Sequence, residues 1–276
     1  MFLFLIASGL SLVFGVMRVL NFAHGSFYMI GAYLAWQMVQ WLTPALDSFW
    51  LAVLAAALGV ALLGGIVERF LLRFLYGREE LYQLLFTYAL VLILGDAVKA
   101  AWGTRQLSVS RPPILAWSLD VFGTTLPGYN LFIILIGPVI AVAVWMVLTR
   151  STAGRLVRAA ALDREMLGAL GANVGLIYTG MFVMSSFLAG LAGALVTPIQ
   201  GIVPGMDVSI IVDAFIVVVI GGLGSFWGTF WGSVIYGQVL SFGILILPGF
   251  SLFSVFALMA VILIVRPWGL FGKPIR

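Results

Sequence analysis

The sequence predicts an all-α polytopic membrane protein, with about eight or nine transmembrane helices, some of them broken or re-entrant. Hydrophobic residues make up 63% of the 276-residue chain and charged residues only 9%, which is too little polar surface for a water-soluble protein of this size. The apolar residues gather in stretches of roughly twenty, the length that spans a bilayer. Because lipid offers the backbone no hydrogen-bond partners, each stretch is expected to be helical.

Nine apolar stretches are candidates for crossings within one transmembrane domain that covers residues 1–276. They lie at about 2–20, 26–43, 49–75, 84–101, 131–149, 177–198, 208–222, 227–246 and 250–266. The first lacks the basic start and the cleavage site of a secretory signal, so it is expected to stay as a helix. Two of them, 26–43 and 208–222, are short or interrupted. Either could be broken or re-entrant, which would lower the count to eight.

The orientation follows from the basic residues, because short loops rich in Lys and Arg stay in the cytoplasm. Ten of the fourteen basic residues fall in three segments: Arg69, Arg73 and Arg78; Arg150, Arg155, Arg158 and Arg164; Arg266, Lys273 and Arg276. These segments are expected in the cytoplasm, together with the C-terminus. The connection 102–130 is rich in Pro, Gly and Trp and has only two arginines, which predicts an ordered external loop. With nine crossings the N-terminus would lie outside.

The residue inventory excludes most enzyme classes. The absence of cysteine rules out disulfides, thiolate metal sites and cysteine nucleophiles. One histidine and ten scattered carboxylates argue against a metal site or a Ser/His/Asp hydrolase. The segment "GLFGK" at 269–273 has neither the glycine spacing nor the Ser or Thr of a phosphate loop. No catalytic or metal-binding residue is therefore expected.

The stretch "RVLNFAHGSF" at 18–27 contains the only histidine, just after the first apolar run. His24 could be an interfacial histidine bonded to a backbone carbonyl, or a proton relay, although no second titrating group is near in sequence. The third reading is a helix interruption. There Asn21 and His24 would bond backbone groups freed by the break, and Gly25 would permit the bend. Such interruptions line cavities where transport substrates bind, so these residues are candidates for a substrate pathway.

Ionisable side chains within spans are functional candidates, because they are costly in lipid unless paired or hydrated. Asp96 and Lys99 lie three apart on the fourth span, where they are expected to pair with each other. Asp213 has no cation near it in sequence, so it either faces a polar cavity or lies near the outer interface. It precedes, by about two turns, a glycine group that joins it among the pathway candidates: Gly221, Gly222 and Gly224.

Glycines recur every four residues in "GGLGSFWGTFWGSVIYG" at 221–237. Gly224, Gly228 and Gly232 would lie along one helix face and let a neighbouring backbone approach closely. A tight contact between helices of this subunit is the main expectation, and a subunit interface or gate is the alternative.

The segment at about 150–176 is the most informative polar segment of the chain. From Thr152 it predicts a short amphipathic helix with Leu162, Met166 and Leu170 on one face, ended by Gly171 as a left-handed cap. Such a helix between two spans needs a cover for its apolar side. The lipid headgroup layer and a soluble partner are both possible covers.

Several motifs, in order and with consistent spacing, resemble the LivH-type permeases of branched-chain amino acid ABC importers. They include "GLSLVFGVMRVLNFAHGSFYMIGAYLAW" (9–36), "GRLVRAAALDREMLGALGANVG" (154–175), "VVVIGGLGSFWGTFWGSVIYG" (217–237) and "VRPWGLFG" (265–272). The resemblance covers nearly the whole chain. It implies the ABC importer permease fold and a multi-pass position in the bacterial cytoplasmic (inner) membrane.

The resemblance also implies partners. They are a second, LivM-type permease, two cytoplasmic ATPase subunits that bind ATP and Mg, a periplasmic or extracellular substrate-binding protein and the bilayer, with no nucleic acid and no cofactor in this chain. It implies that the cytoplasmic segment docks on the ATPase through the positions Gly154, Arg158, Ala159, Asp163, Gly168 and Gly171. One departure concerns Ser26, which stands where relatives often have an acid.

The function implied by the resemblance is half of the translocation pathway for branched-chain or related apolar amino acids. Related importers carry urea, short amides or aromatic acids, and these remain alternative substrates. A self-sufficient secondary transporter or channel is the alternative from another class. It would need more intramembrane carboxylates for coupling ions than this sequence offers.

Overall fold

The computed structural model describes residues 1–46, 49–121, 123–246 and 248–272, and these are mainly helical. The elements in chain order are α1 (Phe2–Met17), α2 (Ala23–Leu46), α3 (Phe49–Phe70), η1 (Leu72–Leu75), α4 (Glu80–Trp102), η2 (Pro113–Leu115), β1 (Ser118–Val121), β2 (Thr124–Pro127), α5 (Gly128–Arg150), α6 (Thr152–Leu162), α7 (Arg164–Ala169), α8 (Val174–Val196), α9 (Met206–Gly221), α10 (Phe226–Ile246), η3 (Pro248–Phe250) and α11 (Ser251–Val265). Strands β1 and β2 form an antiparallel hairpin in which Ser118 pairs with Pro127.

Each of the nine predicted stretches coincides with a helix, and this confirms the helical polytopic class. Among the described residues, six helical segments are long and apolar enough to cross a membrane: α3, α4, α5, α8, α10 and the segment Pro248–Val265. Helix α1 is apolar but shorter. The count of eight or nine crossings therefore stays a prediction.

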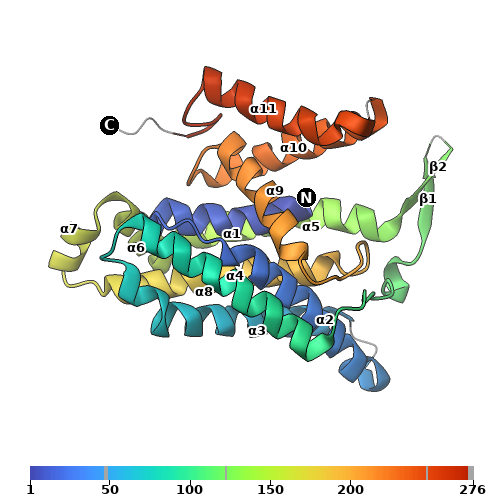
Figure 1. Cartoon of the computed structure of the whole chain (residues 1–276), viewed down its shortest axis with the longest axis horizontal. Coiled ribbons are helices and arrows are strands. Elements are labelled where there is room, and N and C mark those ends of the chain that lie inside the picture. Colours follow the sequence, from blue (N-terminus) through green and yellow to red (C-terminus); the bar gives the residue numbers. More distant parts are fainter. Residues whose placement is uncertain (47–48, 122, 247, 273–276) are drawn as a thin grey trace.

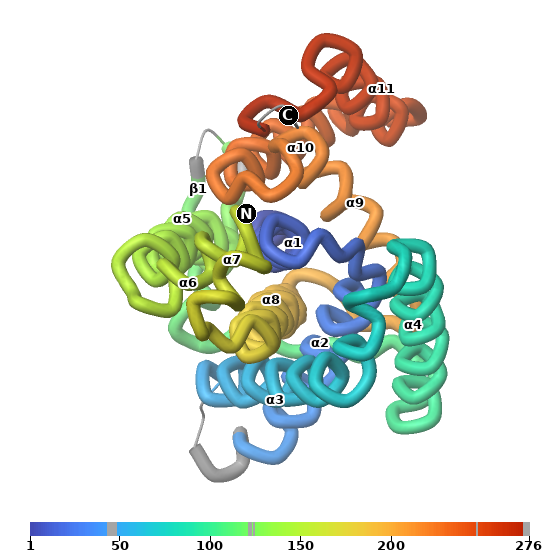
Figure 2. The backbone as a smooth tube through the Cα atoms, turned by 90° about the vertical axis from the view of Figure 1, so that its left-hand side faces the viewer, coloured from blue at the N-terminus to red at the C-terminus, as the bar shows by residue number. Residues whose placement is uncertain are grey.

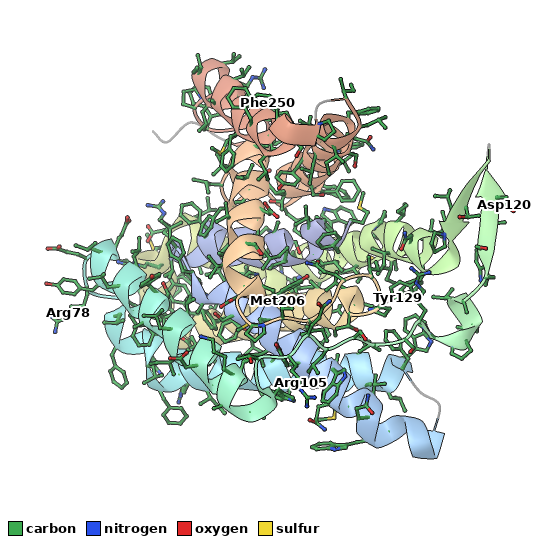
Figure 3. The ribbon with its side chains drawn as sticks, turned by 45° about the vertical axis from the view of Figure 1, so that its right-hand side comes forward. Arg78, Arg105, Asp120, Tyr129, Met206 and Phe250 are labelled. Carbon is green, nitrogen blue, oxygen red and sulfur yellow. The ribbon has the colours of Figure 1, made fainter. Side chains whose placement is uncertain are left out.

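Two of the expectations for single stretches need correction. Helix α2 is continuous over Ala23–Leu46, so the stretch 26–43 is neither short nor broken. The helix expected over 49–75 ends at Phe70 and is followed by the 3₁₀ turn η1. Helix α9 has 16 residues, or about 24 Å at about 1.5 Å per residue, and runs at a steep angle to α1 and α5 in Figures 1 and 3. The doubt about 208–222 as an ordinary crossing thus persists.

The segments predicted on opposite sides of the membrane lie at opposite ends of the molecule. Figure 1 shows α6 and α7 at one end and the β1–β2 hairpin, within the predicted external loop, at the other. Arg78, between α3 and α4, lines the same cavity as Asp163 and Arg164, so two of the three basic segments share one end. In the third segment, Lys273 and Arg276 lie outside the described residues. Which end faces the cytoplasm stays a prediction.

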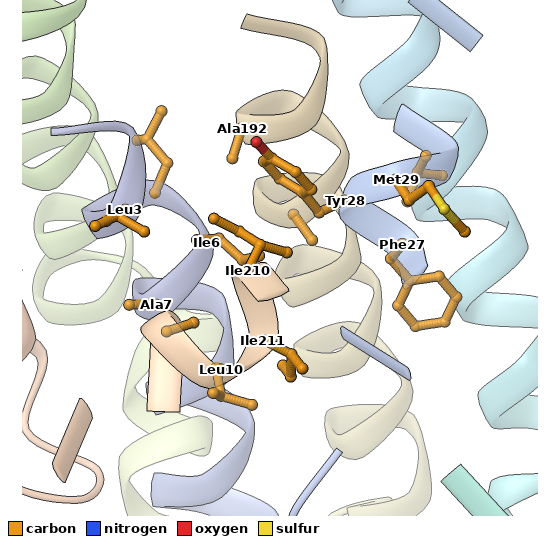
Figure 4. Packing of buried hydrophobic residues seen from close by; sticks show 14 of the residues in the cluster. Leu3, Ile6, Ala7, Leu10, Phe27, Tyr28, Met29, Ala192, Ile210 and Ile211 are labelled. Atoms are coloured by element: carbon orange, nitrogen blue, oxygen red, sulfur yellow. The ribbon is translucent and has the colours of Figure 1, made fainter. Parts of the chain in front are cut away.

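Helix α8 occupies the centre, packed against α1, α2 and α3 (Figure 2). Glycines bring the backbones of α2 and α8 together. A Cβ added at Gly31 would collide with the carbonyl of Gly190, and one added at Gly193 would collide with the carbonyl of Tyr28. Around these contacts, apolar side chains of α1, α2, α8 and α9 fill the core (Figure 4).

The glycine repeat at 224–232 serves two different contacts. Gly228 and Gly232 lie in α10 against the backbone of α9, where added Cβ atoms would collide with Gly221 and approach the carbonyl of Val217. Gly224, however, precedes α10 and has a φ of 78°. It packs on Gly15 of α1, so the expectation that all three glycines share one helix face is wrong. On α4, the predicted pairing of Lys99 with Asp96 is confirmed at 3.0 Å.

We expect Gly193→Ala to lower stability by about 1–3 kcal/mol, because its methyl group would overlap the carbonyl of Tyr28 and force α2 from α8. The matched control is Gly180→Ala on the same helix, where nothing lies within 4 Å of an added Cβ. The measurement is the thermal unfolding midpoint of each variant in detergent. An unchanged midpoint for Gly193→Ala would contradict the close packing of α2 on α8.

Candidate functional site

The turn between α1 and α2 brings the start of α2 into the bundle. Helix α1 ends at Met17, and the chain reverses at Arg18, the one non-glycine residue of the described chain with a positive φ, 54°. The second residue of α2, His24, then lies beside Ile6, in the first half of α1. An interruption between the first two spans is therefore present, and α2 begins alongside the interior of α1.

His24 connects three helices. Its side chain is fully buried, with Nε2 2.8 Å from the carbonyl oxygen of Ile6 and Nδ1 3.4 Å from the hydroxyl of Ser185 in α8. The Ser185 hydroxyl in turn donates to the carbonyl of Gly9 at 2.9 Å. None of these partners titrates, so the contacts fit a hydrogen-bonding role. They also correct the expected mechanism, because Ile6 lies within α1 and its carbonyl was not freed by a break.

Gly25 and Asn21 differ from their expected roles. Gly25 lacks a positive φ and does not make the bend, which occurs at Arg18. Gly25 instead lets the backbone of α9 lie close to α2. Any larger residue would prevent this, because an added Cβ would collide with the carbonyl of Asp207. Asn21 is buried and accepts from the His24 amide through its backbone carbonyl at 3.3 Å. Within the described chain its side-chain oxygen has no hydrogen-bond partner.

The first turns of α2 and α9 meet at a carboxylate that the sequence reading missed. Ser26 donates from its hydroxyl to Oδ2 of Asp207 at 2.8 Å, and both side chains are buried. An anion is stabilised near helix N-termini, so Asp207 suits this position. The sequence signal for this carboxylate was Asp207 itself, which stands two residues after Gly205 in the first turn of a helix.

Asp213 lies at the wall of a cavity between α9, α10 and α11. Its Oδ1 accepts a hydrogen bond from the hydroxyl of Tyr236 at 2.6 Å. The cavity has a volume of about 460 Å³ and is lined otherwise mainly by apolar side chains. Gly221 and Gly222 lie instead at the turn between α9 and α10, where the amide of Phe271 donates to the carbonyl of Gly221 at 3.0 Å.

The pathway candidates thus occupy three separate places in the structure. Asn21, His24 and Gly25 lie in the α1–α2–α9 contact, Asp213 at the cavity, and Gly221, Gly222 and Gly224 around the α9–α10 turn. The structure does not bring them into one cluster. Their part in a substrate pathway stays a prediction.

The polar segment forms two short helices where one was expected. Asp163 ends α6 and begins α7, because its Oδ1 accepts from the amides of Glu165 and Met166 at 3.0 and 2.9 Å. A side chain that caps a new helix competes with continuation of the old one. Gly171 has the predicted left-handed conformation, with a φ of 85°, and Asn173 caps α8 by accepting from the amide of Leu176 at 3.0 Å.

Helix α6 is fixed to the last turns of α5. Gly154 allows the contact, because an added Cβ would collide with the carbonyl of Leu148. Arg158 donates from its guanidinium to that same carbonyl. Ala159 accepts the amide of Asp163 at the end of α6, and Gly168 accepts the amide of Gly171 at the end of α7. The coupling candidates therefore shape this segment and tie it to a long helix.

The face predicted to need a cover is open in the structure. Leu162, Met166 and Leu170 are 88%, 59% and 77% exposed. Such large apolar side chains rarely gather on a water-facing surface unless something binds there. They come from the end of α6, from α7 and from the residue after α7, so the single helix face expected for them is not formed, although the described part of the chain leaves all three side chains uncovered.

A cavity of about 410 Å³ lies between this segment, the end of α1 and the start of α4. Arg18, Arg78, Arg164, Glu80, Asp163 and Glu165 are among its lining residues. Beneath it, Tyr76 donates to Oε1 of the buried Glu68 at 2.6 Å. Burial, and then the bond to Glu68, raise the pKa of Tyr76, which keeps the phenol a neutral donor. Among the described residues no group of three or more His, Asp or Glu could hold a metal.

Comparisons with known proteins match almost the entire chain. Residues 1–265 match the family model described as "Branched-chain amino acid transport system / permease component". The chain is 29% identical to the permease protein BraD of Pseudomonas aeruginosa, named for high-affinity branched-chain amino acid transport, and 28% identical to LivH of Escherichia coli. Both matches cover 98% of this chain and 91% of the relative. A probable LivH of Methanocaldococcus jannaschii is 25% identical, over 85% of this chain and 75% of its own. No solved structure matches.

The contacts of His24 predict different outcomes for two substitutions. His24→Ala removes the bonds to Ile6 and Ser185 and should lower stability by about 1–3 kcal/mol. His24→Gln should retain most of the stability, because its amide nitrogen can donate to the Ile6 carbonyl. Thermal unfolding midpoints in detergent give the comparison. Equal losses in the two variants would contradict the hydrogen-bonding role and reopen a role in proton transfer.

Proposed function

Because the chain belongs to the family of branched-chain amino acid transport permeases, we propose that it is the membrane-spanning subunit of an ATP-driven ABC importer. It would form half of the translocation pathway for branched-chain or related apolar amino acids. The relatives are themselves named as permease proteins of branched-chain amino acid transport. The exposed apolar face of α6 and α7 is the observation that supports a subunit driven from outside the chain.

The exposed face fits a protein partner better than a lipid surface. Arg155, Arg164 and Glu165 are exposed in the same segment as the apolar residues, together with Asp163. A helix that binds the headgroup layer is typically rich in Lys and Arg on its polar side, whereas this segment carries both signs of charge. Mixed charge around an apolar centre is characteristic of protein interfaces. We therefore favour docking on a cytoplasmic ATPase subunit over interfacial anchoring.

A force on α6 would be passed on to the membrane helices. Gly154 and Arg158 hold α6 against the carbonyl of Leu148 in α5. Helix α5 also packs on α1, and an added Cβ at Gly137 of α5 would lie 3.0 Å from the side chain of Met1, the residue before α1. ATP binding in the partner would thus move α6, α5 and α1 together and contribute to alternating access.

The remaining components would be supplied by other chains. We expect a second, LivM-type permease to complete the pathway, two ATPase subunits to bind ATP and Mg, and a periplasmic or extracellular binding protein to deliver the substrate. The C-terminus would face the cytoplasm with α6 and α7. Urea, short amides and aromatic acids are the alternative substrates. A secondary transporter is the alternative mechanism, and it predicts ion-driven uptake by this chain alone in liposomes.

The docking proposal predicts that the apolar face is essential. Replacing Leu162, Met166 and Leu170 together by Ser should weaken docking by at least about a hundredfold, since each buried apolar side chain contributes about 1.5–3 kcal/mol. ATP-driven uptake should then be lost in proteoliposomes. The matched control replaces Ile114 and Leu119, which are 72% and 48% exposed at the opposite end. Undiminished uptake by the first variant would rule out this face as the docking site.

The connection between α6 and α5 gives a second prediction. Arg158→Ala removes the bond to the Leu148 carbonyl and should reduce uptake by about tenfold while the complex stays assembled. Arg155→Ala is the control, because within the described chain the Arg155 guanidinium bonds Thr152 of its own helix, at 3.2 Å, and makes no bond to α5. The measurement is the ratio of substrate transported to ATP hydrolysed. The same ratio in Arg158→Ala and the wild type would contradict a coupling role for Arg158.

A further inference from the structure

The cavity beside Asp213 is a site that the coupling scheme does not use. It has a volume of about 460 Å³, within the range of small-molecule sites. Its walls come from one side of α9, from Tyr236 of α10 and from the first turns of α11. Figure 3 shows α9 crossing the front of the molecule between Met206, at its start, and the helices that carry Phe250. On the cavity side of α9, Val208 and Val212 are 57% and 43% exposed.

A single carboxylate dominates the chemistry of this cavity. Asp213 is half-buried, and its recorded hydrogen bond joins Oδ1 to the hydroxyl of Tyr236. The second oxygen, Oδ2, is left for another donor. Within the described chain no Lys, Arg or His forms an ion pair with Asp213, since the ion pair recorded there joins Lys99 to Asp96. A carboxylate held among apolar walls without a counter-charge favours a cationic ligand.

The other lining side chains determine which chemical group the cationic ligand can have beside its charge. Val208, Val212 and Ile216 of α9 line the cavity together with Leu252, Val255 and Phe256 of α11. These aliphatic and aromatic walls suit a branched apolar side chain. Ser209, one helical turn before Asp213, also lines the cavity, and because its hydroxyl donates to the carbonyl of Met206 at 3.1 Å, it can act toward a ligand as an acceptor. A cationic amine with an attached apolar chain satisfies both parts of the lining.

We infer that this cavity binds a zwitterionic apolar amino acid, with Asp213 accepting the α-ammonium group and the α9–α11 walls holding the side chain. This inference deepens the proposed function and rests on it. It also separates the substrate classes, because neutral urea and short amides offer no charge to Asp213. Aromatic acids without an amine have no ammonium group to offset the repulsion between their own carboxylate and Asp213.

Tyr236 is a positioning residue in this arrangement. Its hydroxyl donates to Oδ1 at 2.6 Å, which restricts rotation of the carboxylate and leaves Oδ2 as the oxygen for a ligand. Removing that hydroxyl should weaken ligand binding less than removing the charge does. The effect of Tyr236→Phe should also depend on the amine, because a ligand without an amine gains nothing from an oriented carboxylate.

The test is photolabelling of the assembled complex in phosphatidylcholine vesicles, without the binding protein. The probe is a leucine analogue with a diazirine in its side chain, and the control probe is the same acid lacking the α-amino group. Labelled peptides are mapped by mass spectrometry. We expect the amine-bearing probe to label α9 or α11 and the control probe to leave them unlabelled.

The variants separate the charge of Asp213 from general effects. Asp213→Asn keeps the size and an acceptor for Tyr236 but should reduce labelling by about tenfold or more. Asp96→Asn is the matched control, because Asp96 lies on α4 in an exposed pair with Lys99. It should label as the wild type does. Tyr236→Phe should show a smaller loss, confined to the amine-bearing probe.

The outcomes distinguish this inference from the proposed function. Equal labelling of Asp213→Asn and the wild type would overturn the inference, even if the vesicles show ATP-driven leucine uptake. Failure of Asp213→Asn alone to assemble would mean that Asp213 pairs with a basic residue of a partner subunit, which also overturns it. Displacement of the probe by phosphatidylethanolamine but not by leucine would assign the cavity to a lipid headgroup instead. Labelling that depends on Asp213, without uptake by the wild type, would support the site and overturn the proposed function.

Discussion

The close approach of α2 to α8 is the constraint on which the rest of the structure depends. Gly31, Gly190 and Gly193 bring the two backbones together, and only then does His24 lie between Ile6 of α1 and Ser185 of α8. The position of His24 fixes where α2 begins. This in turn places Ser26 against Asp207 and sets the start of α9 within the bundle.

The contacts around His24 connect two surfaces of the structure, the cavity at Asp213 and the exposed side of α6 and α7. Helix α9 begins at the Ser26–Asp207 contact and carries Asp213 to the cavity beside α11. Helix α1, held at His24, packs on α5, whose last turns hold α6. The proposed substrate cavity and the proposed ATPase-docking face are therefore linked through α1 and its contacts with α2 and α9. Because the small-residue contacts leave little free space, displacement of one helix should shift its neighbours as a body.

The features predicted from the sequence were those with local causes. Apolar length predicted the nine long helices of the described chain, three-residue spacing predicted the Lys99–Asp96 pair, and Gly171 was predicted as the left-handed cap. Features that depend on distant partners were missed. Nothing near Gly25 in sequence indicates that the carbonyl of Asp207 lies against it, and nothing near Gly224 indicates Gly15. The division of the polar segment at Asp163 was missed because an acidic cap and a helical position use the same residue type.

The central claim is that a cytoplasmic ATPase subunit covers the apolar face of α6 and α7, and it can be measured directly because the chain contains no cysteine. Met166→Cys introduces one thiol on this face, which can carry a cross-linker or a spin label. The account predicts a cross-link to the ATPase subunit in the assembled complex and, without that subunit, a label in contact with water. A label exposed to lipid-dissolved oxygen at headgroup depth, with no cross-link to the ATPase subunit, would contradict it.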